Sequence, residues 1–213
     1  MPGPPSERIL IAGAAGHIET LIDFPEAGVP AAGLALVAHP HPLYGGTLDN
    51  KVVQTLAKTF TELGCIALRP NFRGVGASGG EHDQGNGETD DMESVAAYAR
   101  ERFAGQTLLL AGFSFGCHVQ MRLAKRLRPG CIRRLVLVAP ATGKVSGDRV
   151  YAAEEVPPDS IIIHGEQDQT VPLANVFDWA RPQNLPITVI PGADHFFHRR
   201  LHLIKAIIKR QWQ

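Results

Sequence analysis

Apolar runs of strand length recur along most of the chain, separated by stretches with helical periodicity. Continuous apolar runs predict strands buried on both faces of a sheet, at residues 33–38, 65–69, 107–112, 132–138, 160–163 and 187–190. Two further strands are predicted before them, at residues 8–12 and 18–24. The second of these alternates apolar and polar positions, which is typical of a half-exposed antiparallel edge strand.

Helical stripes fill the intervals between these strands. Apolar residues over 48–63 fall on one face and end at Gly64, a common stop residue for helices. A second helix is predicted to begin near Thr89, where Asp90 and Asp91 suit the positive end of the helix dipole.

A third helix should follow residue 116, and a closing helix should begin near Arg199. This alternation of strand and helix predicts an α/β fold, with a mostly parallel sheet covered by helices on both faces. We expect a single domain over residues 1–213, with residues 1–6 forming a flexible lead-in.

The most informative motif is Gly-Phe-Ser-Phe-Gly at residues 112–116, directly after a predicted buried strand and before a predicted helix. A nucleophilic serine needs a sharp strand-to-helix turn that lifts its hydroxyl clear of the sheet, and flanking glycines leave room for that turn. Ser114 is therefore the candidate nucleophile. The backbone N–H of Phe115, at the helix N-terminus, is the candidate donor to developing negative charge.

A base and an acid follow Ser114 in the required order, each just after a predicted strand. Asp168 follows the strand at 160–163, and His195 follows the strand at 187–190. The carboxyl ends of such strands are where sites form in open α/β sheets, so we expect a Ser-His-Asp triad. Glu166 and Asp194 are competing acids, and the spacing G-x-x-D-x-x-V-P favours Asp168 over both.

These motifs resemble the α/β-hydrolase superfamily over about residues 33–212. The segments His-Pro-His-Pro-Leu-Tyr-Gly-Gly at 39–46 and Asn-Phe-Arg-Gly-Val-Gly-Ala-Ser at 71–78 resemble small bacterial members without a lid, akin to dienelactone hydrolases and serine esterases. The resemblance implies an α/β-hydrolase fold without a cap domain. It also implies a second oxyanion donor in the first segment, at the backbone N–H of His41, with Leu43 or Tyr44 as alternatives.

Neither a metal site nor a dinucleotide site is expected. His39 and His41 stand two residues apart, but prolines stiffen their loop and no Cys or carboxylate lies nearby in sequence, so no metal site is predicted. Residues 74–79 match G-x-G-x-x-G after a strand, yet no helix opens there, as a dinucleotide site requires. We expect residues 74–88 to form a flexible loop on the rim of the site, and we expect no cofactor.

Composition indicates which classes of binding partner and which cellular compartment to expect. Formal net charge is zero, with 21 basic and 21 acidic residues, so no nucleic-acid or acidic-membrane partner is expected. A local basic cluster is interpreted as a solvated helix face and turn, formed by Arg122, Lys125, Arg126, Arg128, Arg133 and Arg134. No membrane span or signal peptide is seen. The three cysteines are expected to be reduced and buried, which favours the cytoplasm. Nothing in the composition specifies an oligomeric state.

The predicted function is hydrolysis of small or short-chain carboxylic esters. About twenty residues separate the strands at 132–138 and 160–163, where lipases of this fold carry a cap, so we expect a shallow, open pocket. Activity should rise with pH as His195 loses its proton. A serine peptidase, thioesterase or acyltransferase on the same triad, and a non-catalytic binding module, remain alternatives.

Overall fold

The computed structural model describes residues 5–127, 130–152 and 154–212. Over these residues the strands are β1 (Ser6–Gly13), β2 (Gly16–Asp23), β3 (Leu34–Ala38), β4 (Ile66–Pro70), β5 (Leu108–Phe113), β6 (Ile132–Val138), β7 (Gly143–Lys144), β8 (Val150–Tyr151), β9 (Ile161–Gly165) and β10 (Thr188–Ile190). The α-helices are α1 (Lys51–Glu62), α2 (Asn86–Arg102), α3 (Phe115–Arg126), α4 (Leu173–Ala180) and α5 (Leu201–Arg210). Short 3₁₀ turns form η1 (Pro42–Tyr44), η2 (Ser146–Asp148) and η3 (Arg181–Gln183).

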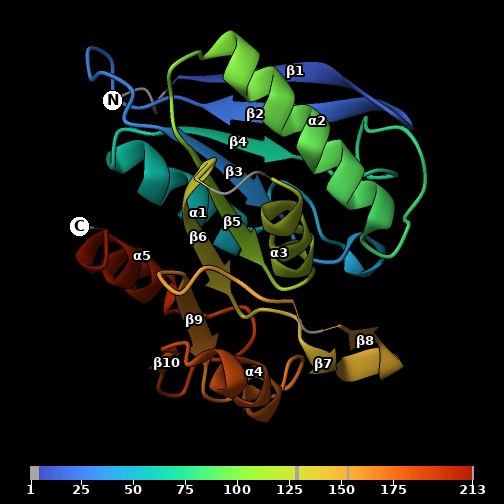
Figure 1. Cartoon of the computed structure of the whole chain (residues 1–213), viewed down its shortest axis with the longest axis vertical. Helices are drawn as coiled ribbons and strands as arrows, with labels where there is room; N and C mark the ends of the chain where they lie inside the picture. The colour runs from blue at the N-terminus through green and yellow to red at the C-terminus, as the bar shows by residue number, and fades with distance from the viewer. Residues whose placement is uncertain (1–4, 128–129, 153, 213) are drawn as a thin grey trace.

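Eight strands form one sheet in the order β1-β2-β4-β3-β5-β6-β9-β10, and β7 pairs with β8 in a separate small sheet (Figure 1). From β4 to β10 all neighbouring strands run parallel, whereas β2 is antiparallel to both β1 and β4. The predicted mostly parallel α/β sheet is confirmed.

Two hydrophobic cores lie on opposite faces of this sheet, because successive side chains of a strand point to opposite sides. In β5, Leu108 and Leu110 pack into one core and Leu109 and Ala111 into the other. Helices α2, α3 and α4 cover the first core, on the near side in Figure 1, and α1 and α5 cover the second. The uninterrupted apolar strands therefore have helices on both faces.

Helix α2 begins at Asn86, so the prediction of a start near Thr89 was wrong. The Glu88 carboxylate accepts hydrogen bonds from the backbone N–H groups of Asp83 and Gly85, which caps the helix one turn earlier. Asp91 is not a dipole partner in the first turn. Its carboxylate instead binds Arg73 through two hydrogen bonds of 2.8 and 2.9 Å.

Three smaller expectations also change. The alternating strand β2 is antiparallel as predicted, but β1 is the edge strand, since β2 has a partner on each side. All three cysteines are free, and Cys65 and Cys117 are buried, but Cys131 is partly exposed. Of the lead-in predicted at residues 1–6, Ser6 already belongs to β1, and residues 1–4 lie outside the described residues. Arg128 of the predicted basic cluster also lies outside them.

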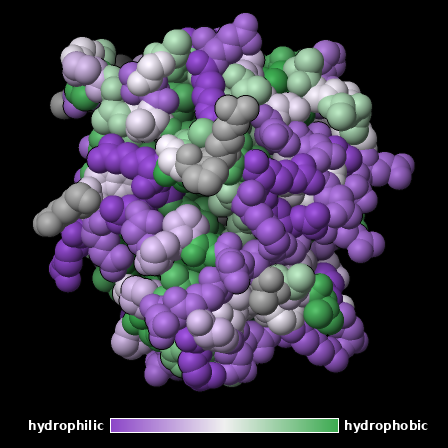
Figure 2. Space-filling model, in the orientation of Figure 1, coloured by the Kyte–Doolittle hydropathy of each residue, from purple (hydrophilic) through white to green (hydrophobic). Residues whose placement is uncertain are grey.

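The described part of the segment between β6 and β9 holds no cap domain, which agrees with the prediction from sequence. Within the described part of that segment, the chain forms only β7, η2 and β8. Figure 2 shows hydrophilic residues over most of the face seen in Figure 1, with smaller hydrophobic areas scattered among them. Val150 of β8 is 72% exposed. This small sheet therefore exposes both an apolar side chain, Val150, and a charged one, Lys144.

Candidate active site

Ser114 occupies the turn between β5 and α3. Its backbone has φ 55° and ψ −118°, a left-handed conformation that is strained for a residue with a side chain. The Ser114 N–H donates to Val138 O of β6 at 3.0 Å, and the Ser114 carbonyl accepts from Cys117 N at 2.9 Å. These bonds hold the strained turn in place, with the hydroxyl at the carboxyl end of the sheet.

Gly112 and Gly116 are required by close backbone contact. A Cβ on Gly112 would lie 2.6 Å from the Cys117 nitrogen, and one on Gly116 would lie 2.3 Å from Ala38 O. Both distances are well below van der Waals contact, so any other residue would push β5, β3 and α3 apart. The two glycines thus allow the tight passage from strand to helix that the motif predicted.

The structure brings Ser114, His195 and Asp168 together in one chain of hydrogen bonds. Ser114 Oγ lies 3.0 Å from His195 Nε2, and His195 Nδ1 lies 2.7 Å from Asp168 Oδ2. The carboxylate can only accept, so Nδ1 carries the proton and Nε2 is free to accept from the serine hydroxyl. All three residues are more than 90% buried.

The Asp168 carboxylate is fixed by backbone as well as by His195. Oδ1 accepts from the N–H groups of Thr170 and Val171 at 2.9 and 2.8 Å, which leaves Oδ2 for the imidazole. Gly165 lets this loop close, since a Cβ there would lie 2.5 Å from Ala193 O. The loops after β9 and β10 therefore pack against each other directly.

The two competing acids have other partners. Glu166 accepts from the Gly192 N–H at 2.7 Å, and Asp194 holds the exposed His198 through Nδ1 at 2.6 Å. The His198 hydrogen bonds hold the pKa of Asp194 below its usual value against the opposing effect of desolvation. Neither carboxylate bonds to His195, so the structure places Asp168 alone on the imidazole among the three candidates.

Sequence reasoning missed a second imidazole beside the acid. His164, at the end of β9, lies with Nε2 3.5 Å from Asp168 Oδ2 and donates from that nitrogen to Val171 O at 3.0 Å. Burial lowers its pKa, so the ring is neutral. The available signal was its position, directly before Gly165 at the end of a buried strand.

His39 and His41 play different parts in the loop after β3. His39 is fully buried. Its Nδ1–H donates to Pro40 O at 2.6 Å, and Nε2 accepts from Phe72 N at 2.9 Å. Burial lowers the pKa of His39 to about 4. Both its nitrogens are thus occupied in holding two loops together. Among the described residues no group of three or more His, Cys, Asp or Glu side chains could hold a metal ion.

The loop from His41 to Gly46 folds back on itself. Leu43 N donates to His41 Nδ1 at 3.3 Å, and Tyr44 N donates to His41 O at 3.1 Å. The backbone N–H of His41 has no acceptor among the residues the structure describes. Phe115 is the first residue of α3, where a backbone N–H has no acceptor within the helix. Two unused N–H donors thus stand in the segments that flank Ser114.

The glycine-rich segment at 74–79 wraps around a buried carboxylate. Glu19 Oε2 accepts from Asn71 Nδ2 at 2.7 Å and from Ala77 N at 2.9 Å, and the Ala77 bond lowers the pKa of Glu19. A Cβ on Gly76 would lie 2.2 Å from the same oxygen. This close approach explains Gly76, whereas a Cβ on Gly79 would instead lie 2.9 Å from Ala15 O.

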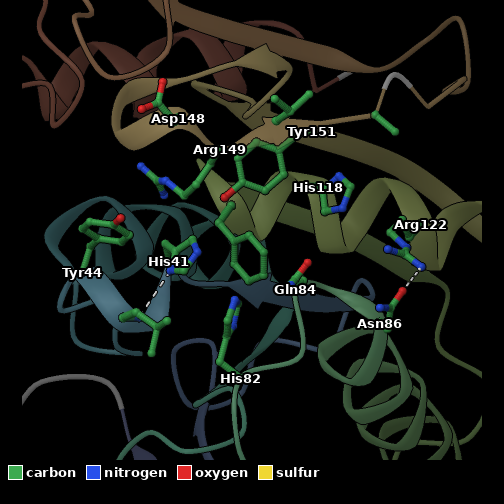
Figure 3. Close-up of a pocket in the computed structure, with 14 residues that line it drawn as sticks. His41, Tyr44, His82, Gln84, Asn86, His118, Arg122, Asp148, Arg149 and Tyr151 are labelled. Carbon is green, nitrogen blue, oxygen red and sulfur yellow. Dashed lines mark hydrogen bonds between the residues drawn. The ribbon is translucent and has the colours of Figure 1, made fainter.

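Two cavities that share wall residues lie at and beside the serine. The smaller, of about 230 Å³, contains Ser114 with His41, Tyr44, Arg149 and Phe196 on its walls. The larger, of about 670 Å³, shares His41, Tyr44 and Arg149 with it and extends along α3 (Figure 3). The loop before α2 supplies His82 and Gln84 to the larger one, and Asn86 lines it from the first turn of α2. The predicted loop at 74–88 therefore lies on the rim of the site, but its last three residues are helical. Its flexibility stays a prediction.

Part of the predicted basic cluster belongs to this site. Arg126 pairs with Asp90 on the exposed surface, as a solvated helix face would. Arg122, one turn earlier on α3, is partly exposed and also lines the larger cavity, a role that the sequence did not predict. No helix in the described part of the chain is both long and apolar enough to cross a membrane.

Comparison with known proteins agrees with this fold. A family model described as serine aminopeptidase, S33, matches residues 45–158. An uncharacterized protein of Rickettsia prowazekii is 35% identical over 198 residues, which is 89% of this chain and 82% of that protein.

Two solved structures are similar over nearly the whole chain. A lid-less α/β serine hydrolase from Xanthomonas campestris has a TM-score of 0.86 at 35% identity, covering 100% of this chain and 96% of that one. An α/β serine hydrolase homologue from Coxiella burnetii has a TM-score of 0.84 at 36% identity, covering 96% of each chain. On this fold and these similarities, the chain belongs to the S33 serine-aminopeptidase family of the α/β-hydrolase superfamily, among the members without a lid.

Proposed function

We propose that the protein is a carboxylesterase that cleaves small or short-chain esters through an acyl-enzyme on Ser114. The observation that carries this proposal is the hydrogen-bonded chain from Ser114 through His195 to Asp168, at 3.0 and 2.7 Å, on a strained serine turn. The arrangement can activate a hydroxyl and hold the resulting imidazolium beside a carboxylate.

In this mechanism His195 Nε2 accepts the Ser114 proton as Oγ attacks the ester carbonyl. Asp168 keeps the imidazole in the required tautomer and stabilises its charged form. His195 then donates the proton to the leaving alcohol, and a water deprotonated by the same nitrogen releases the acid. The products are one carboxylic acid and one alcohol for each ester and water consumed.

We assign the oxyanion to the backbone N–H groups of Phe115 and His41. The preference for His41 over Leu43 and Tyr44 is supported by hydrogen bonding, since the N–H groups of the latter two are engaged within their own loop. Loss of one such donor typically raises the barrier by about 3 kcal/mol. Backbone donors held in a closed loop need little reorganisation when the charge develops.

An aminopeptidase is the second candidate, because the matched family carries that description. A free α-amino group would need acidic partners in the cleft. The larger cavity has Asp148 on its wall, but this carboxylate is exposed and pairs with Lys144 at 2.8 Å, while Arg122 and Arg149 line the same space. The charge balance therefore favours a substrate without an ammonium group.

For the compartment, we propose the cytoplasm on the sequence argument about cysteines alone.

The test is labelling with a fluorophosphonate probe, followed by intact mass, on the wild type and on Ser114→Ala. One adduct on the wild type and none on the variant supports an activated Ser114. No adduct on folded wild type would instead favour a binding module. A panel of p-nitrophenyl esters and aminoacyl anilides then separates esterase from aminopeptidase. Best activity on acyl chains beyond about ten carbons would overturn the short-chain assignment.

A further inference from the structure

The larger cavity adjoins the smaller one that contains Ser114. His41, Tyr44 and Arg149 line both cavities, so a group bound in the larger one can be joined to an ester at the serine. With about 670 Å³, this space is far larger than the methyl or ethyl group of a minimal ester requires. Its shape and charge therefore carry information about the rest of the substrate.

The walls of this cavity are a set of aromatic rings in mutual contact. The Phe115 ring lies 4.8 Å from His41, 5.4 Å from His82 and 6.0 Å from Tyr151, centroid to centroid, and His118 lies 5.1 Å from Tyr151. Figure 3 shows His41, His82, His118 and Tyr151 converging from the loop after β3, the loop before α2, α3 and β8. Flat walls of this kind suit stacking or edge contact with a planar ring.

Two imidazoles on these walls, those of His41 and His118, are neutral and have nitrogens without a hydrogen-bond partner among the described residues. Burial, with the nearby cations, lowers the pKa of His41 and of His118 to about 4. His41 Nδ1 accepts from Leu43 N, so the proton of the neutral ring is on Nε2, which has no acceptor in the described part of the chain. His118 is 5% exposed, and its buried Nδ1 has no hydrogen-bond partner in the described part of the chain. The walls therefore offer polar contacts as well as stacking.

Two guanidinium groups stand at opposite ends of the row of rings in Figure 3. Arg149 donates to Ser146 O and stacks over Tyr44 at 4.2 Å. Arg122 donates one hydrogen bond to Asn86 Oδ1 at 2.7 Å. Over the described residues, neither pairs with a carboxylate, in contrast to Arg126 one turn along α3. The free N–H groups of Arg122 form a fork suited to a planar anion.

We propose that this cavity binds an aryl carboxylate: a planar ring that stacks on the aromatic walls, carries the ester toward Ser114, and presents a carboxylate to Arg122 at the far end. The inference rests on the proposed esterase function and names its substrate class. Arg122 acts in this proposal as a specificity residue, because it contacts the substrate far from the bond that breaks.

Binding is tested first on Ser114→Ala, by isothermal titration calorimetry, so that turnover plays no part. The probes are monomethyl terephthalate and 4-acetoxybenzoate, which place the ring on the acyl and the alcohol side, with methyl benzoate and phenyl acetate as uncharged counterparts. A bidentate contact to a charged group predicts that at least one carboxylate probe binds about tenfold more tightly than its counterpart. If neither carboxylate probe binds more tightly than its uncharged counterpart, the proposal is overturned.

The matched variants are Arg122→Gln and Arg126→Gln, each in the Ser114→Ala background. The first removes the cation of the cavity, and the second removes a cation on the same helix that pairs with Asp90 outside it. We expect Arg122→Gln to abolish the preference for the carboxylate probe and Arg126→Gln to preserve it. Equal loss in both variants, or retention in Arg122→Gln, would refute the assignment.

Stacking is tested with the saturated analogue, monomethyl cyclohexane-1,4-dicarboxylate, which keeps the charge and loses the planar ring. Binding as tight as that of monomethyl terephthalate would refute the aromatic part of the proposal. Kinetics on the wild type then separate the two proposals. Tight binding without hydrolysis of any ester would refute the esterase proposal and leave the cavity assignment standing. Hydrolysis with no preference for aryl carboxylates would refute the cavity assignment and leave the esterase proposal standing.

Discussion

Asp168→Asn should inactivate the protein through a change of tautomer at His195. In the native site Oδ1 accepts two backbone N–H groups, from Thr170 and Val171. The amide of the Asp168→Asn variant must place its oxygen toward these two N–H groups, since an NH₂ group cannot accept their hydrogen bonds. Its NH₂ group then faces His195 Nδ1, where Oδ2 stands at 2.7 Å in the native protein. The imidazole can accept this bond only with its proton on Nε2, so it can no longer take the proton of Ser114.

The expected loss follows from this geometry. The wrong tautomer and the missing carboxylate charge together cost about 10⁴ in kcat, or about 5.5 kcal/mol of barrier. The assay measures kcat/KM on p-nitrophenyl acetate alongside the rate of fluorophosphonate labelling, which reports activation of Ser114 without turnover. Circular dichroism and Tm check that the variant remains folded.

The controls are Asp194→Asn and Glu166→Gln, the two carboxylates that the sequence offered as alternatives. Their partners are His198 and the Gly192 N–H, so both variants should keep activity within about threefold of the wild type. The reasoning is refuted if Asp168→Asn retains more than about a tenth of kcat/KM, or if either control loses more than it does.

Three further outcomes are expected. Gly116→Ala should lower Tm by roughly 10 °C, since its Cβ would lie 2.3 Å from Ala38 O; an unchanged Tm in calorimetry would contradict the tight turn. Burial holds the pKa of His39 at about 4, below its ordinary 6.5, so the unfolded chain takes up the proton first and stability falls as pH drops through this window. The free energy of unfolding should fall by about 2 kcal/mol by pH 5. Denaturant titrations should find a smaller fall in His39→Gln and an unchanged one in His17→Gln. Equal pH dependence in the two variants would contradict the assignment to His39. Gln120→Met should cost about 2 kcal/mol in urea unfolding, because its amide donates to two buried strand carbonyls, and a neutral result would show that these carbonyls find other donors.

Much of the fold was readable from the sequence because its signals are local. A strand buried on both faces must be apolar at every position, and β3 and β5 are. The turn at Ser114 needs glycines on both sides for steric reasons, and Gly112 and Gly116 stand at those positions. Such constraints act within a few residues, so the parallel sheet and the candidate nucleophile could be predicted without coordinates.

Helix boundaries and side-chain partners that depend on contacts between distant parts of the chain could not be predicted from the sequence. Helix α2 begins at Asn86 because Glu88 caps it, whereas Asp91 is held by Arg73, 18 residues earlier in the chain. The sequence pattern treated Asp91 as a dipole partner because only its position along the helix was visible. The same holds for the helix that was not predicted, α4, whose short apolar face is defined by packing against the sheet.

The sequence alone determined the fold class and a short list of candidate residues: Ser114, His195 and three carboxylates after the last strands. Tertiary structure decided which carboxylate meets the imidazole, because hydrogen bonding selects by distance and direction, and only Asp168 satisfies both. It also decided that Arg122 faces a cavity while Arg126 faces solvent. The two lie one turn apart on α3, and their surroundings come from α2 and β8, far away in the chain.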